Sequence, residues 1–313
     1  MMNVLFSIDL SYWQYLGITL SSLLRANRNE SFQVFVMATA APSPEDAEKL
    51  AAIVNAAGNA TFHVIPMKDT AALKDLPLNE HLSVATYYRL LLVQYLPSTI
   101  DRILYLDSDL LIQSSHIREL WETDLGDNYL GAVMEPYSAR TREPLGFGPQ
   151  DFYFNAGIML VNLRKWREDG VTARLLTFAA ENSERLPGHD QDVLNCVFRG
   201  KVTPLDLCWN WQAVFPRWLP QQLGISQKQF DRYKQNPGII HFTGHLKPWF
   251  WRWQPHYKDL YLRAKAHTPW AATRPVDKMP RNIPVKLRRR LQQFLEWNLP
   301  GLTGGYLRAR PRK

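Results

Sequence analysis

Cysteine is scarce in this sequence of 313 residues, which contains only Cys196 and Cys208. The two are far apart and form no Cys-x-x-Cys pair, which argues against a zinc ribbon or a disulfide-stapled fold and fits a reducing compartment. Long hydrophobic runs are also lacking, because no segment approaches the roughly 18 uncharged apolar residues of a membrane-spanning helix. The first residues, MMNVLFSIDLSYW, lack the basic region and long apolar core of a secretory signal, since Asp9 interrupts them. We therefore expect a cytoplasmic protein.

Surplus positive charge is missing from most of the chain, although the whole sequence carries a net +8. Residues 271–313 contain 11 Lys and Arg against Asp277 and Glu296, a net +9, so residues 1–270 carry only −1. A near-neutral body argues against a nucleic-acid-binding surface, which would make that body basic. A basic end segment instead predicts contact with an anionic surface, either a membrane or a polyanion.

The basic segment contains a candidate amphipathic helix at residues 284–299, PVKLRRRLQQFLEWNL. Its apolar residues share one face, which is typical of a helix in a membrane interface, and Trp297 favours this reading. The alternative is a helix packed on its own domain with a solvated basic face. We therefore expect a folded domain, residues 1–270, and a tail, residues 271–313, that holds the protein peripherally on the inner membrane face. The apolar face contains Leu287, Leu291, Phe294 and Leu295, and the basic residues Lys286, Arg289 and Arg290 lie elsewhere.

Short apolar runs alternate with amphipathic stretches along the first hundred residues. This order of strand, helix, strand, helix, strand predicts parallel pairing with helices on both faces of a sheet. We predict an α/β fold with a Rossmann-like mixed, mostly parallel sheet and flanking helices. The predicted strands are residues 3–8, 32–38, 61–65, 102–106, 130–134, 157–161 and 238–242, and the predicted helices are residues 15–25, 44–57, 84–95 and 191–198.

The run RILYLDSDLLI, residues 102–112, ends a predicted strand with two carboxylates, Asp107 and Asp109, on either side of Ser108. Ligands bind at the carboxyl ends of strands in open α/β sheets. Two carboxylates at alternate positions can turn toward one point, where a divalent cation would remove their repulsion. Mg²⁺ and Mn²⁺ often bind through such carboxylates plus substrate phosphates, so the triplet suggests a metal that bridges to a diphosphate. The alternative is a capped strand end with two solvated Asp side chains.

Further blocks extend this pattern in order along the chain. After an N-terminal strand that leads to Asp9 and Tyr12 come LSVATYYRL, RILYLDSDLL, WETDLGDNYLGA, YFNAGIMLVNLRKWR, HDQDVLN and HFTGHLKPW. The series resembles glycosyltransferase family 8, the retaining, metal-dependent enzymes that use UDP-sugars, over about residues 3–255. Within that family the chain looks most like the bacterial lipopolysaccharide α-galactosyl- and α-glucosyltransferases.

The resemblance implies a GT-A-type fold and gives roles to individual positions. Asp107, Asp109 and His241 match the family's metal ligands, and an imidazole among them suits Mn²⁺ better than Mg²⁺. Asp190 and Gln191 match the catalytic pair beneath the donor sugar, although Asp190 would also serve as a helix N-cap. Ten further positions match the family's contacts to the UDP-sugar: Ser7, Asp9, Tyr12, Arg89, Ser108, Asn155, Ala156, Gly157, Gly244 and Lys247.

Two features qualify or extend this set of donor contacts. Leu10 and Ser11 depart from the family's pattern, which often has a second acidic residue and Asn after Asp9, so part of the nucleoside contact set differs. Lys247 falls at the diphosphate, where it would add positive charge opposite the leaving group. Taken alone, a lysine at this position would be an ordinary surface residue, but the surrounding GHLKPW favours the diphosphate role.

Retention of configuration has two routes, a covalent glycosyl-enzyme or delivery of the acceptor on the leaving-group face. The family places Gln191 near the anomeric carbon, and an amide is a poor nucleophile. We therefore expect front-face delivery, with the Gln191 carbonyl stabilising positive charge and a leaving phosphate oxygen taking the acceptor proton.

The acceptor side is less defined by the sequence. His81 and Thr86 are candidate acceptor residues, and the loop at residues 136–152 is a candidate lid over the donor. Six tryptophans supply aromatic faces for sugars, but most tryptophans in any fold belong to the core. These are Trp209, Trp211, Trp218, Trp249, Trp251 and Trp253.

The leading hypothesis is thus an enzyme that moves a hexose from a UDP-hexose to a saccharide or lipid-linked acceptor, the lipopolysaccharide core. The sequence leaves galactose and glucose open as the donor sugar. One alternative is a phosphoaspartyl hydrolase, but that chemistry places its motif on the first strand. The others are a nucleotide-sugar-binding protein without transfer activity, a transferase for another glycan, and a nucleic-acid binder, which the near-neutral body opposes.

Overall fold

The computed structural model of the chain describes residues 1–68, 70–73, 76, 84–136, 143–148, 151–244, 247–251 and 256–277. The predicted tail helix at residues 284–299 lies outside these ranges, as do His81, Trp253 and part of the loop at residues 136–152. Within the described part, Trp270 is buried and packs against α1 (Trp13–Ala26). The division into residues 1–270 and 271–313 therefore stays a prediction from composition.

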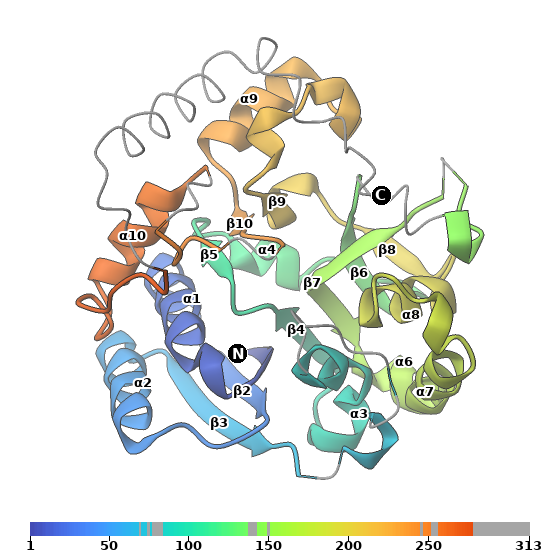
Figure 1. Cartoon of the computed structure of the whole chain (residues 1–313), viewed down its shortest axis with the longest axis horizontal. Helices are drawn as coiled ribbons and strands as arrows, with labels where there is room; N and C mark the ends of the chain where they lie inside the picture. Colours follow the sequence, from blue (N-terminus) through green and yellow to red (C-terminus); the bar gives the residue numbers. More distant parts are fainter. Residues whose placement is uncertain are drawn as a thin grey trace.

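A seven-stranded sheet runs through the described part of the molecule (Figure 1). Its strand order is β3-β2-β1-β4-β7-β6-β8. The strands from β3 to β4 pair in parallel, β7 is antiparallel to both of its neighbours, and β8 is again parallel to β6. The predicted mixed, mostly parallel sheet is confirmed. The strands are β1 (Met2–Ile8), β2 (Phe32–Ala38), β3 (Ala60–Pro66), β4 (Arg102–Leu106), β6 (Leu130–Met134), β7 (Phe154–Asn162) and β8 (Val202–Pro204).

A second, three-stranded sheet was not predicted. Its order is β5-β10-β9, formed by β5 (Leu110–Ile112), β10 (Ile239–His241) and β9 (Trp211–Gln212). β5 follows β4 after three residues and pairs antiparallel with β10, with His241 opposite Leu110. This pairing brings the end of the predicted strand at residues 238–242 next to the acidic triplet, although the two segments are about 130 residues apart in sequence.

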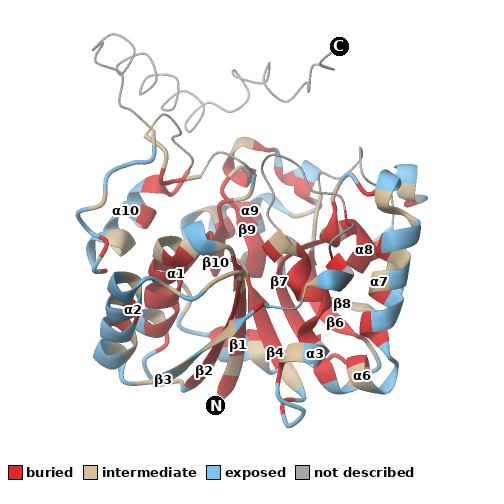
Figure 2. Ribbon diagram, turned by 60° about the horizontal axis from the view of Figure 1, so that its bottom comes forward, coloured by how far each residue is buried: buried red, intermediate tan, exposed pale blue. Residues whose placement is uncertain are grey.

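Helices cover both faces of the main sheet, and most residues of its central strands are buried between them, whereas the edge strands β3 and β8 are partly exposed (Figure 2). The alternation within β1 shows the two faces directly. Val4 and Phe6 belong to one core, with residues of α1, α2 and α4, and Leu5 belongs to the other, with residues of α3, α6, α7 and α8. The helices are α2 (Pro44–Ala57), α3 (Leu92–Tyr95), α4 (Ile117–Trp121), α6 (Leu163–Glu168), α7 (Val171–Glu181) and α8 (Asp190–Val197).

Local signals explain why α2 has the predicted bounds. Ser43 accepts a hydrogen bond from the Asp46 backbone N–H at 3.1 Å, and Pro44 occupies the first turn. Gly58 ends the helix with φ 69°, a left-handed conformation that favours glycine. A Ser-Pro start and a glycine stop are therefore legible in the sequence.

The stretch at residues 84–95 is not the single long helix that we predicted. It forms a 3₁₀ helix, η3 (Val84–Leu90), followed by the one-turn α3. Tyr87, Tyr88, Arg89 and Leu90 are all buried, so the segment is interior on every side and its apolar pattern does not distinguish helix types. The Leu91 N–H bonds to the Tyr88 carbonyl at 2.9 Å, a tight-turn bond.

A third core, rich in aromatic residues, packs the small sheet against α9 (Gln227–Gln235) and α10 (Lys258–Ala266). Trp211 and Trp218 are buried here, and so is Trp249. Three of the proposed sugar platforms are therefore core residues, as is Trp209 at the edge of the sheet. Among the described helices, none is long and apolar enough to cross a bilayer.

Candidate active site

The acidic triplet lies where the two sheets meet, immediately after β4. Asp107 and Asp109 project toward His241 at the end of β10, with His241 Nε2 3.4 Å from Asp109 Oδ1 and 3.8 Å from Asp107 Oδ2. One ligand atom from each of the three residues lies within 4.8 Å of the others. The structure thus brings together the three residues that the family resemblance assigns to the metal.

Gly157 on β7 leaves the space in which these three side chains converge. Its carbonyl accepts a hydrogen bond from the Asp107 N–H at 2.8 Å, which ties the triplet to β7. A Cβ at this position would lie 2.3 Å from His241 Cε1 and 2.8 Å from Asp107 Oδ2. Any larger residue would therefore push the imidazole and the carboxylate apart.

A chain of hydrogen bonds fixes which nitrogen of His241 carries a proton. The Gly157 backbone N–H donates to Asn155 Oδ1 at 3.0 Å, so that atom is an acceptor. Asn210 Nδ2 donates to the same oxygen at 2.9 Å, which turns Asn210 Oδ1 toward His241 Nδ1, 2.9 Å away. Nδ1 is then a donor, so Nε2, which faces the two carboxylates, is the nitrogen that remains to bind a metal.

This donor set fits a divalent cation. Asp109 is buried, and its Oδ1 has no hydrogen-bond partner among the described residues. A buried carboxylate oxygen without a hydrogen-bond partner is costly unless a cation lies against it, and the adjacent imidazole can share that cation. Two carboxylates and one imidazole are ligands that Mn²⁺ accepts, so the residues present match a metal site.

Lys247 forms an ion pair with the other carboxylate oxygen of Asp109, Oδ2. Its Nζ lies 2.5 Å from Asp109 Oδ2 and 2.8 Å from the Phe242 carbonyl. Burial alone would raise the pKa of Asp109, but the Lys247 ammonium and His241 outweigh it and hold that pKa well below its usual range. Asp109 is therefore a carboxylate at neutral pH, as a metal ligand must be.

Arg89 joins the triplet to Asp190 at the start of α8. Its guanidinium lies 3.0 Å from Asp107 Oδ1 and 3.0 Å from Asp190 Oδ2, and it donates to the Ala156 carbonyl at 2.6 Å. Burial opposes its charge, yet Asp107 and Tyr105 raise the Arg89 pKa further above its ordinary value. In this structure the buried arginine therefore forms ion pairs with two carboxylates, those of Asp107 and Asp190.

Asp190 is buried and has two partners. Its Oδ1 accepts from the Thr86 hydroxyl at 3.0 Å, and its Oδ2 faces Arg89. Burial raises the pKa of Asp190, Arg89 opposes that shift, and the Asp107 charge adds to it. Both carboxylate oxygens are thus already engaged.

Gln191, in the first turn of α8, forms a hydrogen bond with Ala156 of β7. Its Oε1 accepts from the Ala156 N–H at 3.0 Å, and its Nε2 lies 3.4 Å from the Tyr153 hydroxyl. Asn195, one turn along α8, bonds to both the N–H and the carbonyl of Phe154, at 2.7 and 2.9 Å. These bonds clamp α8 to β7 and set the position of the Gln191 amide.

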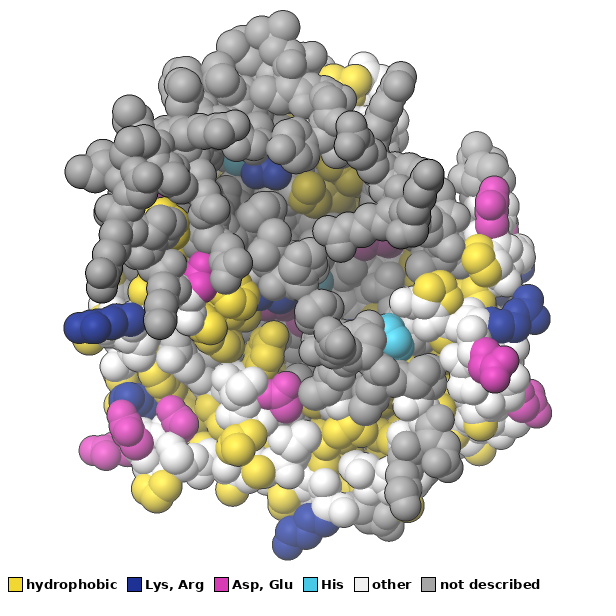
Figure 3. All heavy atoms as spheres, in the orientation of Figure 1, with side chains coloured by type: hydrophobic (Ala, Val, Ile, Leu, Met, Phe, Trp, Pro, Cys, Tyr) yellow, Lys and Arg dark blue, Asp and Glu magenta, His cyan; other side chains and the backbone are white. Residues whose placement is uncertain are grey.

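A cavity of about 140 Å³ opens beside the triplet, at the carboxyl ends of β1 and β4. In Figure 3, acidic, basic and histidine side chains are visible at the bottom of a hollow near the middle of the face. Three lining residues, Ala85, Thr86 and Arg89, come from η3, and Thr86 is one of the two acceptor candidates. The predicted donor contacts in the lining are Ser7, Asp9, Tyr12, Arg89 and Ser108, and the predicted metal ligands there are Asp107 and Asp109.

Asp9 and Tyr12, which the family resemblance assigns to the nucleoside, lie at the two ends of a short helix. Asp9 accepts from the Ser11 N–H at 2.8 Å and from its hydroxyl at 2.6 Å, so it caps the short helix η1 (Leu10–Tyr12). Tyr12 packs edge-on against Trp249, with ring centroids 5.9 Å apart. Burial, with the nearby Asp109 charge, raises the Tyr12 pKa, so its hydroxyl stays protonated. Gly244 has φ 80° and is not among the described residues that line the cavity.

Sequence reasoning missed a polar network behind the metal ligands. Glu135 Oε2 accepts from Asn155 Nδ2 at 3.0 Å and from Gln212 Nε2 at 2.7 Å. Asn210 belongs to the same network through Asn155. Two signals were available: Glu135 directly follows the predicted strand at residues 130–134, and Asn210 and Gln212 are polar residues within an apolar WNWQAVF run.

Comparison with known proteins agrees with this geometry. Residues 3–252 match the model of the family described as Glycosyl transferase family 8. A lipopolysaccharide 1,3-galactosyltransferase of Salmonella typhimurium is 27% identical over 86% of this chain and 79% of its own. General stress protein A of Bacillus subtilis is 29% identical over 64% of this chain and 72% of its own. The crystal structure of the galactosyltransferase LgtC with donor and acceptor sugar analogues superposes with a TM-score of 0.72 at 26% identity, covering 91% of this chain and all (100%) of the LgtC chain.

Proposed function

This chain belongs to glycosyltransferase family 8, and from that premise we propose that it moves galactose or glucose from a UDP-hexose to a saccharide acceptor with retention of configuration. The proposed acceptor is the lipopolysaccharide core. The observation that carries the proposal is the convergence of Asp107, Asp109 and a correctly oriented His241 beside a polar cavity. Relatives named as lipopolysaccharide galactosyl- and glucosyltransferases support the acceptor class.

The proposed metal is Mn²⁺ or Mg²⁺, held by Asp107, Asp109 and His241. When bound, it would neutralise the charge that develops on the departing diphosphate. Lys247 adds a fixed ammonium at the same place, since it already lies against Asp109. Ser7, Asp9 and Tyr12 supply the wall of the cavity in which the nucleoside would lie.

In the proposed reaction the bond between the anomeric carbon and the phosphate oxygen breaks. The acceptor hydroxyl oxygen forms the new bond on the same face, and its proton passes to the leaving phosphate oxygen. Gln191 Oε1 accepts a hydrogen bond from the Ala156 N–H, which holds the orientation of the amide and leaves its oxygen a second lone pair. We place that carbonyl dipole against the positive charge at the anomeric carbon.

The engagement of Asp190 supports front-face delivery over a covalent route. Both of its carboxylate oxygens are occupied, one by Arg89 and the other by Thr86. A nucleophilic carboxylate would have to give up one of these buried partners, which costs free energy. Trapping of a glycosyl adduct on Asp190 by a slow donor analogue would overturn this assignment.

The test is a UDP-release assay with the full chain on four donors: UDP-galactose, UDP-glucose, UDP-N-acetylglucosamine and UDP-glucuronate. We expect Mn²⁺-dependent release from one of the two hexose donors and none in EDTA. Release that does not need a metal would overturn the proposed site. Preference for one of the other two donors would overturn the hexose assignment.

A second assay separates the acceptor classes. Transfer to truncated lipopolysaccharide, with the anomeric configuration of the product read by NMR, supports the proposal if the configuration is retained. Donor hydrolysis without transfer to that acceptor, but with transfer to another saccharide, would favour a transferase for a different glycan. Binding of UDP-hexose without release would favour a nucleotide-sugar-binding protein.

We also propose that the protein works on the cytoplasmic side of the inner membrane and attaches peripherally through residues 271–313. The support is the net charge of +9 in that segment and its amphipathic pattern. An enzyme that extends a lipid-linked saccharide gains from this attachment, because the acceptor is confined to the same surface.

A further inference from the structure

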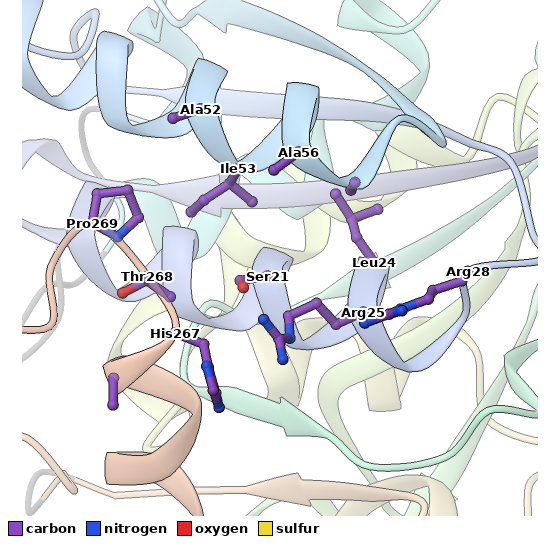
Figure 4. A pocket seen from close by; sticks show the side chains of 12 residues that line it. Ser21, Leu24, Arg25, Arg28, Ala52, Ile53, Ala56, His267, Thr268 and Pro269 are labelled. Carbon is purple, nitrogen blue, oxygen red and sulfur yellow. The ribbon is translucent and has the colours of Figure 1, made fainter.

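A second opening lies apart from the donor cavity, between α1, α2 and the residues that follow α10 (Figure 4). It is a groove of about 680 Å³. Figure 4 shows α1 between the two walls, with α2 on one side and residues 267–269 on the other. Tyr12, which lines the donor cavity, precedes α1, and Arg25, which lines the groove, lies in its last turn. A helix of this length spans about 20 Å, so the two openings are separate.

The groove is cationic, although the body of the protein is not. Arg25, Arg28 and His267 line it, and no lining residue is acidic. Within the described ranges, none of the three makes an ion pair with a carboxylate. Residues 1–270 carry a net −1, so two arginines without a carboxylate partner are not a by-product of a basic surface. Their uncompensated charge predicts an anionic ligand.

The side of the groove that α2 forms is apolar. Ala52, Ile53 and Ala56 of α2 point toward α1, where Leu24 contributes a further aliphatic side chain (Figure 4). Ala52 and Ala56 are exposed, and their small side chains leave the space open. A ligand that matches both walls has a negative group at one end and hydrocarbon at the other.

We propose that this groove binds the headgroup of an anionic phospholipid. The phosphate lies among Arg25, Arg28 and His267, and the glycerol and first acyl carbons lie against α2. The volume suits a small ligand of this kind. The basic tail is the other candidate occupant from this chain, but its own surplus of positive charge would repel it from these arginines. The groove is thus a lipid contact on the folded body, additional to the contact proposed for the tail.

Arg25 has an ordinary structural role as well, because a cation in the last turn of a helix interacts favourably with the helix dipole. That role predicts an effect on stability and none on lipid binding. Arg28 lies beyond the end of α1, so the dipole does not account for it.

The test uses the full chain and a soluble short-chain lipid, so that the groove is measured without a membrane surface. Binding of dihexanoyl-phosphatidylglycerol below its micelle concentration is measured by calorimetry. Dihexanoyl-phosphatidylcholine and inorganic phosphate are the two reference ligands. Arg25→Glu/Arg28→Glu reverses the charge of the groove, and Ala56→Trp fills its apolar wall without a change of charge.

We expect one site for the phosphatidylglycerol that is weakened about ten-fold or more by Arg25→Glu/Arg28→Glu. The control Arg164→Glu/Lys228→Glu makes the same change of net charge at exposed residues of α6 and α9, and should bind as the native chain does. Ala56→Trp should weaken the lipid and leave phosphate binding unchanged. Thermal unfolding confirms that each variant is folded.

Three results would overturn the proposal. Equal loss in the control variant would mean that net charge alone drives binding. Phosphate that binds as tightly as the lipid would mean a small-anion site, and binding that survives in Arg25→Glu/Arg28→Glu would place the lipid elsewhere. UDP release from the donor should be unchanged in all these variants, so a failed groove is distinguishable from a failed proposal about the reaction.

Discussion

At the residue scale, the candidate site depends on hydrogen bonds that set the state of each ligand before any metal arrives. His241 shows this most clearly, because the backbone N–H of Gly157 acts on it through two amides, Asn155 and Asn210. The result is that Nε2, the nitrogen that remains to bind a metal, faces two carboxylates. The pattern of the sequence identified the ligands but gave no sign of Asn210, since an amide in an apolar run has many uses.

The first prediction compares two substitutions in the site. Asp109→Asn should reduce turnover by roughly a thousand-fold, because a neutral amide loses the charge that holds a divalent cation. Gln191→Ala should cost only about ten- to a hundred-fold, since its dipole stabilises the transition state without holding the metal. Steady-state UDP release under saturating Mn²⁺ measures both. Equal losses in the two variants would contradict the roles assigned to them.

The second prediction concerns Asn210, which we treat as a positioning residue because it acts through His241. Asn210→Leu removes the acceptor opposite Nδ1, and should weaken Mn²⁺ binding about ten- to a hundred-fold. Asn210→Asp gives up the donation to Asn155 but keeps an oxygen opposite Nδ1, and should lose less affinity than Asn210→Leu. Electron paramagnetic resonance of free Mn²⁺, without donor, gives the affinity directly. If both variants lose affinity equally and unfold at a lower temperature, Asn210 has a packing role only.

At the element scale, the sequence predicted what local patterning determines. The strands at residues 32–38, 102–106 and 130–134 and the helix at residues 44–57 have the predicted bounds. The prediction of a single helix at residues 84–95 was wrong, because burial on all sides removes the periodicity that identifies a helix. Strand β7 begins at Phe154, three residues earlier than predicted, where it enters the site.

The pairing of the three-stranded sheet could not be predicted from local patterns, although β10 lies within the predicted strand at residues 238–242. Its strands have two or three residues each, and β5 and β10 pair across about 130 residues of sequence. No periodicity develops over such lengths. The convergence of the metal ligands therefore came from the ordered motifs of the family and not from the spacing of residues.

The third prediction tests the contact between α1 and the segment after α10. A Cβ at Gly17 would lie 2.2 Å from Cζ3 of Trp270, so Gly17→Ala must displace a buried indole. We expect a loss of about 1–3 kcal/mol in the free energy of unfolding, even though alanine favours the helix itself. Urea denaturation followed by circular dichroism measures the loss.

The companion variant for this contact is Trp270→Leu, which removes the indole atoms that clash. In that background Gly17→Ala should be neutral or stabilising by up to about 1 kcal/mol, because only the helix propensity remains. If the substitution destabilises both backgrounds equally, Gly17 is constrained by something other than Trp270.

At the scale of the whole molecule, two charge patterns are kept apart. The body is nearly neutral, and in the site Arg89 and Lys247 offset the charge of the carboxylates. The end of the chain carries the surplus of +9. Sequence composition alone identified this division, but it did not identify the cationic groove on the body, because Arg25, Arg28 and His267 come together only through packing.

The last prediction tests the tail as the main membrane contact. Lys286→Gln/Arg289→Gln/Arg290→Gln removes three of its positive charges, each worth about 1 kcal/mol at an anionic surface. Partition of the full chain onto vesicles of phosphatidylcholine and phosphatidylglycerol should fall by roughly two orders of magnitude. Sedimentation of the vesicles measures this, and UDP release in solution serves as the control, since the donor cavity is lined by other residues. Undiminished partition would mean that the tail is not the anchor, and the Arg25→Glu/Arg28→Glu variant would then show whether the groove accounts for the attachment.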